Sequence, residues 1–188
     1  MAPFVGLTGG LGAGKSEALR ILDELGASTL STDAVVHELL ASDDVQRALA
    51  ERFGADVASD RGLIAERVFG DDDERAWLEG LLWPLVGKRV AAWRSSLPAD
   101  RVAVVEVPLL FESGMEEVFD ATIAVIADEA TRERRAAARG HAAVAERAGR
   151  QLSQAQKAER ADFTVRNDGS LDELKQTLSH VLEKIESL

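Results

Sequence analysis

Residues 9–16 constrain this chain of 188 residues more than any other segment, because they read Gly9-Gly10-Leu11-Gly12-Ala13-Gly14-Lys15-Ser16. An apolar run at Phe4–Thr8 precedes the segment, and a helical pattern at Glu17–Leu25 follows it. A glycine-rich turn with lysine and serine at this spacing, between a strand and a helix, is a Walker-A phosphate loop. The segment therefore predicts a site for the phosphates of ATP and its Mg²⁺.

Each residue type in the loop has a physical role. Glycines at positions 9, 10, 12 and 14 let the backbone take positive φ and turn N–H groups inward, and the helix N-terminus adds partial positive charge. Lys15 can reach the β- and γ-phosphate oxygens, and the Ser16 hydroxyl is placed to ligate Mg²⁺. The expected nucleotide-binding residues are Gly9, Gly10, Leu11, Gly12, Ala13, Gly14, Lys15 and Ser16, and Ser16 is the expected metal ligand.

Five short runs have the composition of β-strands. They are mostly continuous apolar runs, which is typical of strands that are covered on both faces. Helical segments between them can supply the crossovers that a parallel sheet needs, so the chain is expected to be an α/β protein. The expected strands are Phe4–Thr8, Ser28–Ser31, Val102–Val107, Thr122–Ile126 and, more weakly, Phe163–Val165.

Two longer stretches are expected to be helical insertions. Helical periodicity covers residues 34–40 and continues over 43–97, where an apolar stripe that includes Trp77, Leu81 and Leu85 is expected to be core. The segment Thr131–Arg160 holds eight Lys or Arg and three Glu, which is a net charge of +5. It is either a solvated helix face with paired charges or an arginine-bearing lid over phosphates.

Composition limits the partners and the compartment. The formal net charge of −11 disfavours nucleic acid, and the absence of cysteine excludes a disulfide scaffold. The longest apolar runs are too short to span a bilayer, and the first residues do not form a secretory leader. We expect a cytoplasmic protein with a small-molecule substrate, no nucleic acid or membrane partner, and a monomeric or weakly homo-oligomeric state.

Two acidic residues stand near the expected carboxyl edge of the sheet, where ligands bind in open α/β folds. Asp33 follows the second strand, where it could accept a hydroxyl proton or cap a helix. Glu106 lies within the third apolar strand, just before Pro108, where it could support Mg²⁺ through water or form a structural ion pair.

Two further positions have two interpretations each, and two arginines are candidate cations. Glu112 could contact an acceptor or cap a helix, and Asn167 could approach adenine or belong to an Asn-Asp-Gly turn. Arg139 and Arg147 are the leading cations in the basic segment, because guanidinium groups match phosphate geometry.

Taken together, these residues resemble the dephospho-CoA kinase family almost from end to end. The resemblance is carried by the segment Leu7 to Ser16, Asp33-Ala34, Leu81-Leu82 with Pro84-Leu85, Pro108-Leu109-Leu110-Phe111-Glu112, Arg135 with Arg139, Arg147 with Gln151, Ala161-Asp162 and Asn167-Asp168-Gly169-Ser170. The family phosphorylates the ribose 3′-hydroxyl of dephospho-CoA with ATP, the last step of coenzyme A biosynthesis. Its architecture is similar to nucleoside monophosphate kinases, a P-loop fold with a five-stranded parallel sheet.

The resemblance also implies roles for domains and residues. Residues 1–188 would form one kinase domain, with 34–95 as the helical acceptor-binding subdomain and 131–160 as the lid region. The catalytic residues would be Asp33 as general base, Lys15 and Arg139. Arg147 and Asn167 would join the nucleotide site, and Asp33, His37, Phe111 and Glu112 would bind the acceptor.

The chain departs from the family pattern at three positions. Ser31 replaces the first carboxylate of Asp-x-Asp, His37 stands where arginine is frequent, and Trp83 replaces the histidine before Pro84. Two alternatives therefore stay open, a P-loop kinase for a nucleoside monophosphate or sugar acid, and a nucleotide-binding switch without transfer activity. A guanine-selective switch usually carries an Asn-Lys-x-Asp box, and Asn167, the sole asparagine, is not in one.

Overall fold

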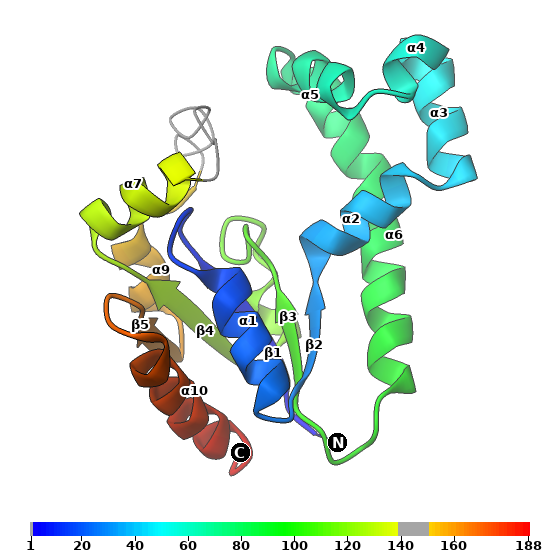
Figure 1. Cartoon of the computed structure of the whole chain (residues 1–188). Coiled ribbons are helices and arrows are strands. Elements are labelled where there is room, and N and C mark those ends of the chain that lie inside the picture. Colours follow the sequence, from blue (N-terminus) through cyan, green and yellow to red (C-terminus); the bar gives the residue numbers. More distant parts are fainter. Residues whose placement is uncertain (1, 139–150) are drawn as a thin grey trace. The chain divides into compact units, whose positions relative to one another are not determined.

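A five-stranded parallel sheet organises the computed structural model, which describes residues 2–138 and 151–188 (Figure 1). The strands lie in the order β2-β3-β1-β4-β5, so β1 is central. Every neighbouring pair is parallel, which confirms the predicted sheet and the α/β class. The strands are β1 (Phe4–Gly9), β2 (Ser28–Ser31), β3 (Ala103–Glu106), β4 (Ala121–Ile126) and β5 (Phe163–Arg166), each within one residue of its predicted bounds.

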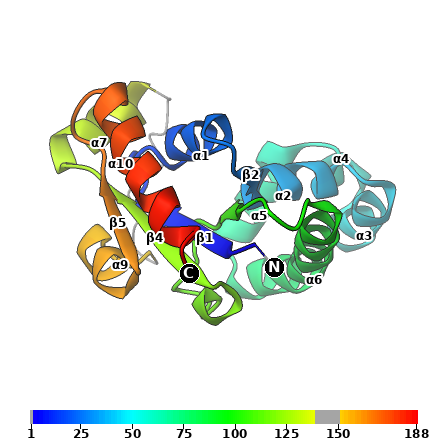
Figure 2. The same cartoon turned by 90° about the horizontal axis from the view of Figure 1, so that it is seen from below.

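Successive residues of a strand point to opposite faces of the sheet, so each face needs its own covering elements. On one face, Val5 and Leu7 belong to the main apolar core with residues of α1 (Lys15–Glu24) and α10 (Leu171–Ile185). On the other face, a side chain at Gly6 would meet Leu110 and Phe119, each 3.0 Å away. Figure 2 shows α1 and α10 on one side of the sheet and α9 (Gln154–Arg160) on the other.

The described chain divides into two compact units. The first runs up to Ser31 and resumes at Leu97, and it contains the whole sheet. The second, Thr32–Ser96, consists of α2 (Thr32–Leu40), α3 (Asp43–Phe53), α4 (Ala55–Ala58), α5 (Arg61–Phe69) and α6 (Asp72–Ser96). The prediction that residues 43–97 are helical is confirmed, while the acceptor-binding role of 34–95 stays a prediction.

The apolar stripe of α6 differs from its prediction as core. Only Leu82 is buried along this helix, and Trp77, Leu81 and Leu85 keep intermediate exposure. Trp77 packs edge-on against Phe53 of α3, with ring centroids 5.3 Å apart. The stripe is therefore only partly covered, and α6 leaves part of its apolar surface exposed.

Capping residues define the helices around the last strand. Ser153 begins α9 and Ser170 begins α10, each in a capping box with the residue three positions on, Gln156 and Glu173. In each box the serine side chain accepts from a backbone N–H of the first turn, and the residue three positions on accepts from the backbone N–H of the serine. The other elements of the described residues are α7 (Glu129–Ala138) and a 3₁₀ turn, η1 (Glu116–Val118). Among residues 2–138 and 151–188, no helix is both long and apolar enough to cross a membrane.

Candidate active site

The phosphate loop joins the central strand β1 to α1. Its glycines take positive φ at Gly9, Gly12 and Gly14, as predicted, and not at Gly10. At position 10 glycine is required because a larger residue does not fit, since its Cβ would lie 2.9 Å from Cγ of Gln154. Within the described residues, α1 starts after Gly14 with no side-chain capping hydrogen bond, and the partial positive charge of its N-terminus favours an anion at the loop.

The Lys15 side chain lies along the loop, and its predicted contact with the nucleotide phosphates stays a prediction. Its ammonium donates to the carbonyl oxygens of Gly9 at 3.1 Å and Gly10 at 3.2 Å. Ser16 is the next residue of α1 and is exposed. The loop therefore presents an ammonium, a hydroxyl and backbone donors within one turn of chain, which is the donor set that phosphate oxygens need.

Asn167 holds the loop from the other end of the chain. The residue is 4% exposed, and its side-chain amide donates to the carbonyl oxygen of Ala13 at 2.9 Å. Its backbone N–H donates to the carbonyl oxygen of Ile126 at 2.8 Å, which extends the β4–β5 pairing by one hydrogen bond. A Cβ at Gly14, where φ is +95°, would overlap the Asn167 amide nitrogen. Asn167 thus supports the loop backbone, and its predicted contact with the nucleotide stays a prediction.

Two arginines of α7 also support the loop, and the sequence reasoning gave neither of them a place in the site. Arg132 Nε donates to the carbonyl oxygen of Leu11 at 3.0 Å, and Arg135 Nη1 donates to that of Asn167 at 3.1 Å. Gly12 fits against this helix because a Cβ there would lie 2.6 Å from the Arg132 carbonyl oxygen. The net positive charge of the segment was a signal for such cations, but Arg139 and Arg147, the residues expected to supply them, lie outside the described residues.

Gln154, at the start of α9, is a further site residue that the sequence did not indicate. Its amide oxygen accepts from the backbone N–H of Ala127 at 3.0 Å, and its amide nitrogen donates to the carbonyl of Ala127 at 2.8 Å. This pair of bonds fixes the chain just beyond β4, while Cγ of Gln154 packs on Gly10. No local sequence pattern marks a glutamine that binds a distant backbone group, so this role could not be predicted from the sequence.

Asp128 anchors the start of α7, the helix whose Arg132 contacts the phosphate loop. Its carboxylate accepts from the backbone N–H of Thr131 at 2.7 Å and from the Thr131 hydroxyl at 2.9 Å. These bonds hold the pKa of Asp128 below its ordinary value, the backbone bond most strongly. Its own N–H donates to the Asp168 carboxylate at 2.6 Å, which ties α7 to the residues after β5.

The predicted base and the predicted acceptor-binding histidine belong to the second unit. Asp33 is the second residue of α2 and is exposed, so its carboxylate is accessible to solvent. His37 lies one turn further on, also exposed, and its Nδ1 contacts the guanidinium of Arg61 from α5. Sequence reasoning did not single out Arg61 as a neighbour of His37. The catalytic role of Asp33 and the acceptor role of His37 stay predictions.

Glu106 ends β3 at the carboxyl edge of the sheet. It is 4% exposed and lies in register between Leu7 of β1 and Ser31 of β2. A buried carboxylate at this edge fits a magnesium-supporting role as well as a structural one. In the part of the chain that the structure describes, no three His, Asp or Glu side chains gather into a metal site. A metal here would rely on Ser16 and on phosphate oxygens of the nucleotide for its ligands.

Phe111 and Glu112 were predicted to bind the acceptor, and their side chains contact the helix α9. Phe111 is 3% exposed, with the guanidinium carbon of Arg160 4.9 Å from its ring centroid. Glu112 Oε1 lies 3.0 Å from the ammonium of Lys157. Neither contact tests an acceptor role, which stays a prediction for both residues.

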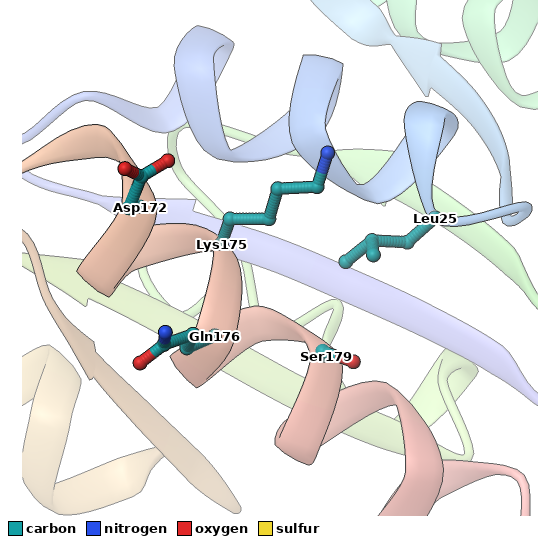
Figure 3. A pocket seen from close by; sticks show the side chains of 5 residues that line it. All are labelled: Leu25, Asp172, Lys175, Gln176 and Ser179. Carbon is teal, nitrogen blue, oxygen red and sulfur yellow. The ribbon is translucent and has the colours of Figure 1, made fainter.

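A pocket of about 390 Å³ opens elsewhere in the first unit. Figure 3 shows its lining residues, which come from the C-terminal end of α1 and from one side of α10. They are Leu25, Asp172, Lys175, Gln176 and Ser179. Because the phosphate loop adjoins the opposite, N-terminal end of α1, this pocket is separate from the predicted nucleotide site.

Comparisons with known proteins agree with the loop and the sheet. Residues 3–173 match the family described as Dephospho-CoA kinase. A dephospho-CoA kinase of Protochlamydia amoebophila is 37% identical over 193 residues, which covers 96% of this chain and 95% of that protein. A crystal structure from Thermus thermophilus superposes with a TM-score of 0.86 at 32% identity, over 97% of each chain.

A more distant structure confirms the fold alone. Shikimate kinase from Acinetobacter baumannii has a TM-score of 0.57 at 13% identity, with 100% of this chain and 94% of that chain covered. The predicted P-loop kinase fold is therefore confirmed. Because the family match spans most of the chain, and the relative is aligned over nearly its whole length, this chain belongs to the dephospho-CoA kinase family of coenzyme A biosynthesis.

Proposed function

We propose that this chain transfers the γ-phosphoryl group of ATP to the ribose 3′-hydroxyl of dephospho-CoA and so produces coenzyme A. The observation that carries the proposal is the phosphate loop, where Lys15 and the start of α1 follow β1 in a chain of this family. Phosphoryl transfer needs positioning and charge stabilisation more than covalent chemistry by the protein. The loop supplies both for the terminal phosphates.

In the proposed step, the Asp33 carboxylate accepts the proton of the 3′-hydroxyl. The hydroxyl oxygen forms a bond to the γ-phosphorus, and the bond between that phosphorus and the β–γ bridging oxygen breaks. Lys15 and the loop N–H groups stabilise the charge that develops on the phosphate oxygens. The products are coenzyme A and ADP, and the proton on Asp33 returns to solvent.

Chain connectivity supports Asp33 as the base. Ser31 ends β2 at the same edge of the sheet as the phosphate loop, through the register that links Ser31 to Glu106 and Glu106 to Leu7. Two peptide units separate Ser31 from Asp33, so their Cα atoms are at most about 7.6 Å apart. An exposed carboxylate so close to this edge can meet a hydroxyl of the acceptor.

Mg²⁺ would be held by the Ser16 hydroxyl and the nucleotide, with Glu106 as an outer partner, and when bound it neutralises phosphate charge. Arg139 and Arg147 remain our candidates for further cations near the phosphates, and Phe111, Glu112 and His37 for acceptor contacts. We propose a monomeric or weakly associated cytoplasmic enzyme.

The proposed function is tested by incubating the chain with ATP, Mg²⁺ and a panel of acceptors. We expect ADP release with dephospho-CoA and a new phosphate on the ribose 3′-oxygen, located by phosphorus NMR. Turnover of AMP or gluconate in place of dephospho-CoA would refute the acceptor assignment. Preference for GTP binding with no acceptor turnover would favour a switch.

Substitution of Asp33 tests the base. Asp33→Asn removes the proton acceptor and keeps the shape, so turnover should fall about 10²- to 10⁴-fold while ATP affinity is retained. The control is Asp43→Asn, because Asp43 is also an exposed first-turn acid, in α3 of the same unit. Normal turnover by Asp33→Asn would show that Asp33 acts only in the helix.

A further inference from the structure

Lys157 of α9 is a fully buried cation, with its side chain 0% exposed. Its ammonium lies 2.7 Å from the carbonyl oxygen of Pro108, 3.0 Å from Oε1 of Glu112 and 3.5 Å from the hydroxyl oxygen of Thr8. A lysine ammonium has three N–H groups, so these three oxygens can occupy all of them. Each of the three oxygens belongs to a segment at the carboxyl edge of the central strands.

Two of these partners flank the phosphate loop. Thr8 immediately precedes Gly9, and Pro108 lies two residues beyond Glu106, the end of β3. The Thr8 hydroxyl also donates to the Pro108 carbonyl at 3.2 Å. The Lys157 ammonium, the Thr8 hydroxyl and the Pro108 carbonyl thus form a triangle of contacts, which links the end of β1 to the segment after β3.

Glu112 connects this triangle to the segment that leads into α9. Its Oε1 accepts from Lys157 and also from the backbone N–H of Leu152 at 2.8 Å. Its Oε2 is buried and, in the described part of the chain, has no hydrogen-bond partner. A carboxylate with one oxygen unsatisfied is a poor way to gain stability, so the pair calls for another explanation.

Stability alone does not account for a charged pair at this place. Apolar side chains of similar volume commonly match or exceed the stability of a buried ion pair, whereas removal of one partner leaves an uncompensated charge. What an apolar pair cannot do is direct three separate oxygens toward one point. The ion pair specifies the distance between the phosphate loop and the segment Pro108–Glu112.

We propose that Lys157 and Glu112 are a positioning pair for phosphoryl transfer. Lys157 touches neither substrate nor reacting atoms, and the pair holds Thr8, Pro108 and Leu152 in a fixed relation to one another next to the phosphate loop. This inference rests on the proposed function, since the step that it supports is the transfer from ATP to the acceptor. It predicts that a variant without either charge can regain stability and still be slow in catalysis.

The test compares single and double variants. Lys157→Met and Glu112→Gln each leave one buried group without its partner, so each should lower the Tm. The double variant removes both charges, and its glutamine can still accept from Leu152, so most of the lost Tm should return. Its kcat should nevertheless stay about 10- to 100-fold below wild type, with KM values changed less, because a misplaced loop slows transfer.

The control is the Lys175–Glu24 pair, which joins α10 to α1 at 3.5 Å and is about half exposed. Lys175→Met with Glu24→Gln should leave kcat unchanged. ATP titration of the same samples counts the competent sites, so kcat per site remains measurable in a partly unfolded variant. A double variant of Lys157 and Glu112 with wild-type kcat per site would overturn the proposal. Wild-type protein without turnover of dephospho-CoA would instead reject the proposed function.

Discussion

Substitution of Gly14 by alanine measures how strongly the phosphate loop depends on Asn167. Gly14 has φ +95°, where an L-residue is disfavoured by about 1–2 kcal/mol. The new Cβ would also overlap the Asn167 amide nitrogen and displace it from the carbonyl of Ala13. Leaving these buried groups unpaired should add about 1–3 kcal/mol. The free energy of unfolding should therefore fall by about 3 kcal/mol in total, which lowers the Tm by about 6–12 °C for a chain of this size.

Gly26 provides a matched control for the backbone effect. Its φ is +101°, and a Cβ there would meet nothing within 4 Å, so Gly26→Ala should cost only about 1–2 kcal/mol. In an Asn167→Ala background, Gly14→Ala should have the same small effect, because the overlapping amide is gone. Chemical denaturation of the four variants gives each free energy of unfolding. The reasoning is refuted if Gly14→Ala is no more destabilising than Gly26→Ala in the wild-type background.

Two further predictions concern helix starts. Because its hydrogen bonds from Thr131 lower the pKa of Asp128, this carboxylate stabilises the fold above the ordinary aspartate pKa, and the stabilisation is lost as the pH falls through the lowered value. Tm measured against pH should therefore fall less steeply at acid pH for Asp128→Asn than for wild type, and parallel curves would contradict the assignment. Ser170→Ala should lower the free energy of unfolding by about 1 kcal/mol, because α10 loses its cap, and thermal unfolding measures the loss. An unchanged Tm would show that Glu173 or water replaces the hydroxyl.

The strands and the phosphate loop could be predicted because their signals are local. A short apolar run such as Phe4–Thr8, followed at once by glycines, is typical of a strand covered on both faces, so its position could be predicted from the sequence. The loop motif was equally clear, because each of its steps requires a residue type at a fixed spacing. The prediction failed at Gly10, where a neighbouring side chain and not the backbone conformation requires glycine.

The apolar stripe of α6 shows the limit of reading periodicity. Helical spacing predicted the helix correctly, but not that Trp77, Leu81 and Leu85 would be only partly buried. Periodicity reports the side on which apolar groups lie, whereas burial depends on how much of that side another element covers. That coverage is a property of the tertiary structure.

By itself, the sequence determined the α/β class, the order of strands and helices along the chain and the phosphate loop, since these depend on residues close together in the chain. Only the tertiary structure decided which distant residues support that loop. The Asn167 amide binds Ala13 across 154 residues, and the Lys157 ammonium reaches Thr8 across 149. Such pairs form because parallel strands need long crossovers, which bring remote segments to one edge of the sheet. From the sequence alone, a lysine within a basic segment is expected to be solvated, and only the fold shows that Lys157 is buried.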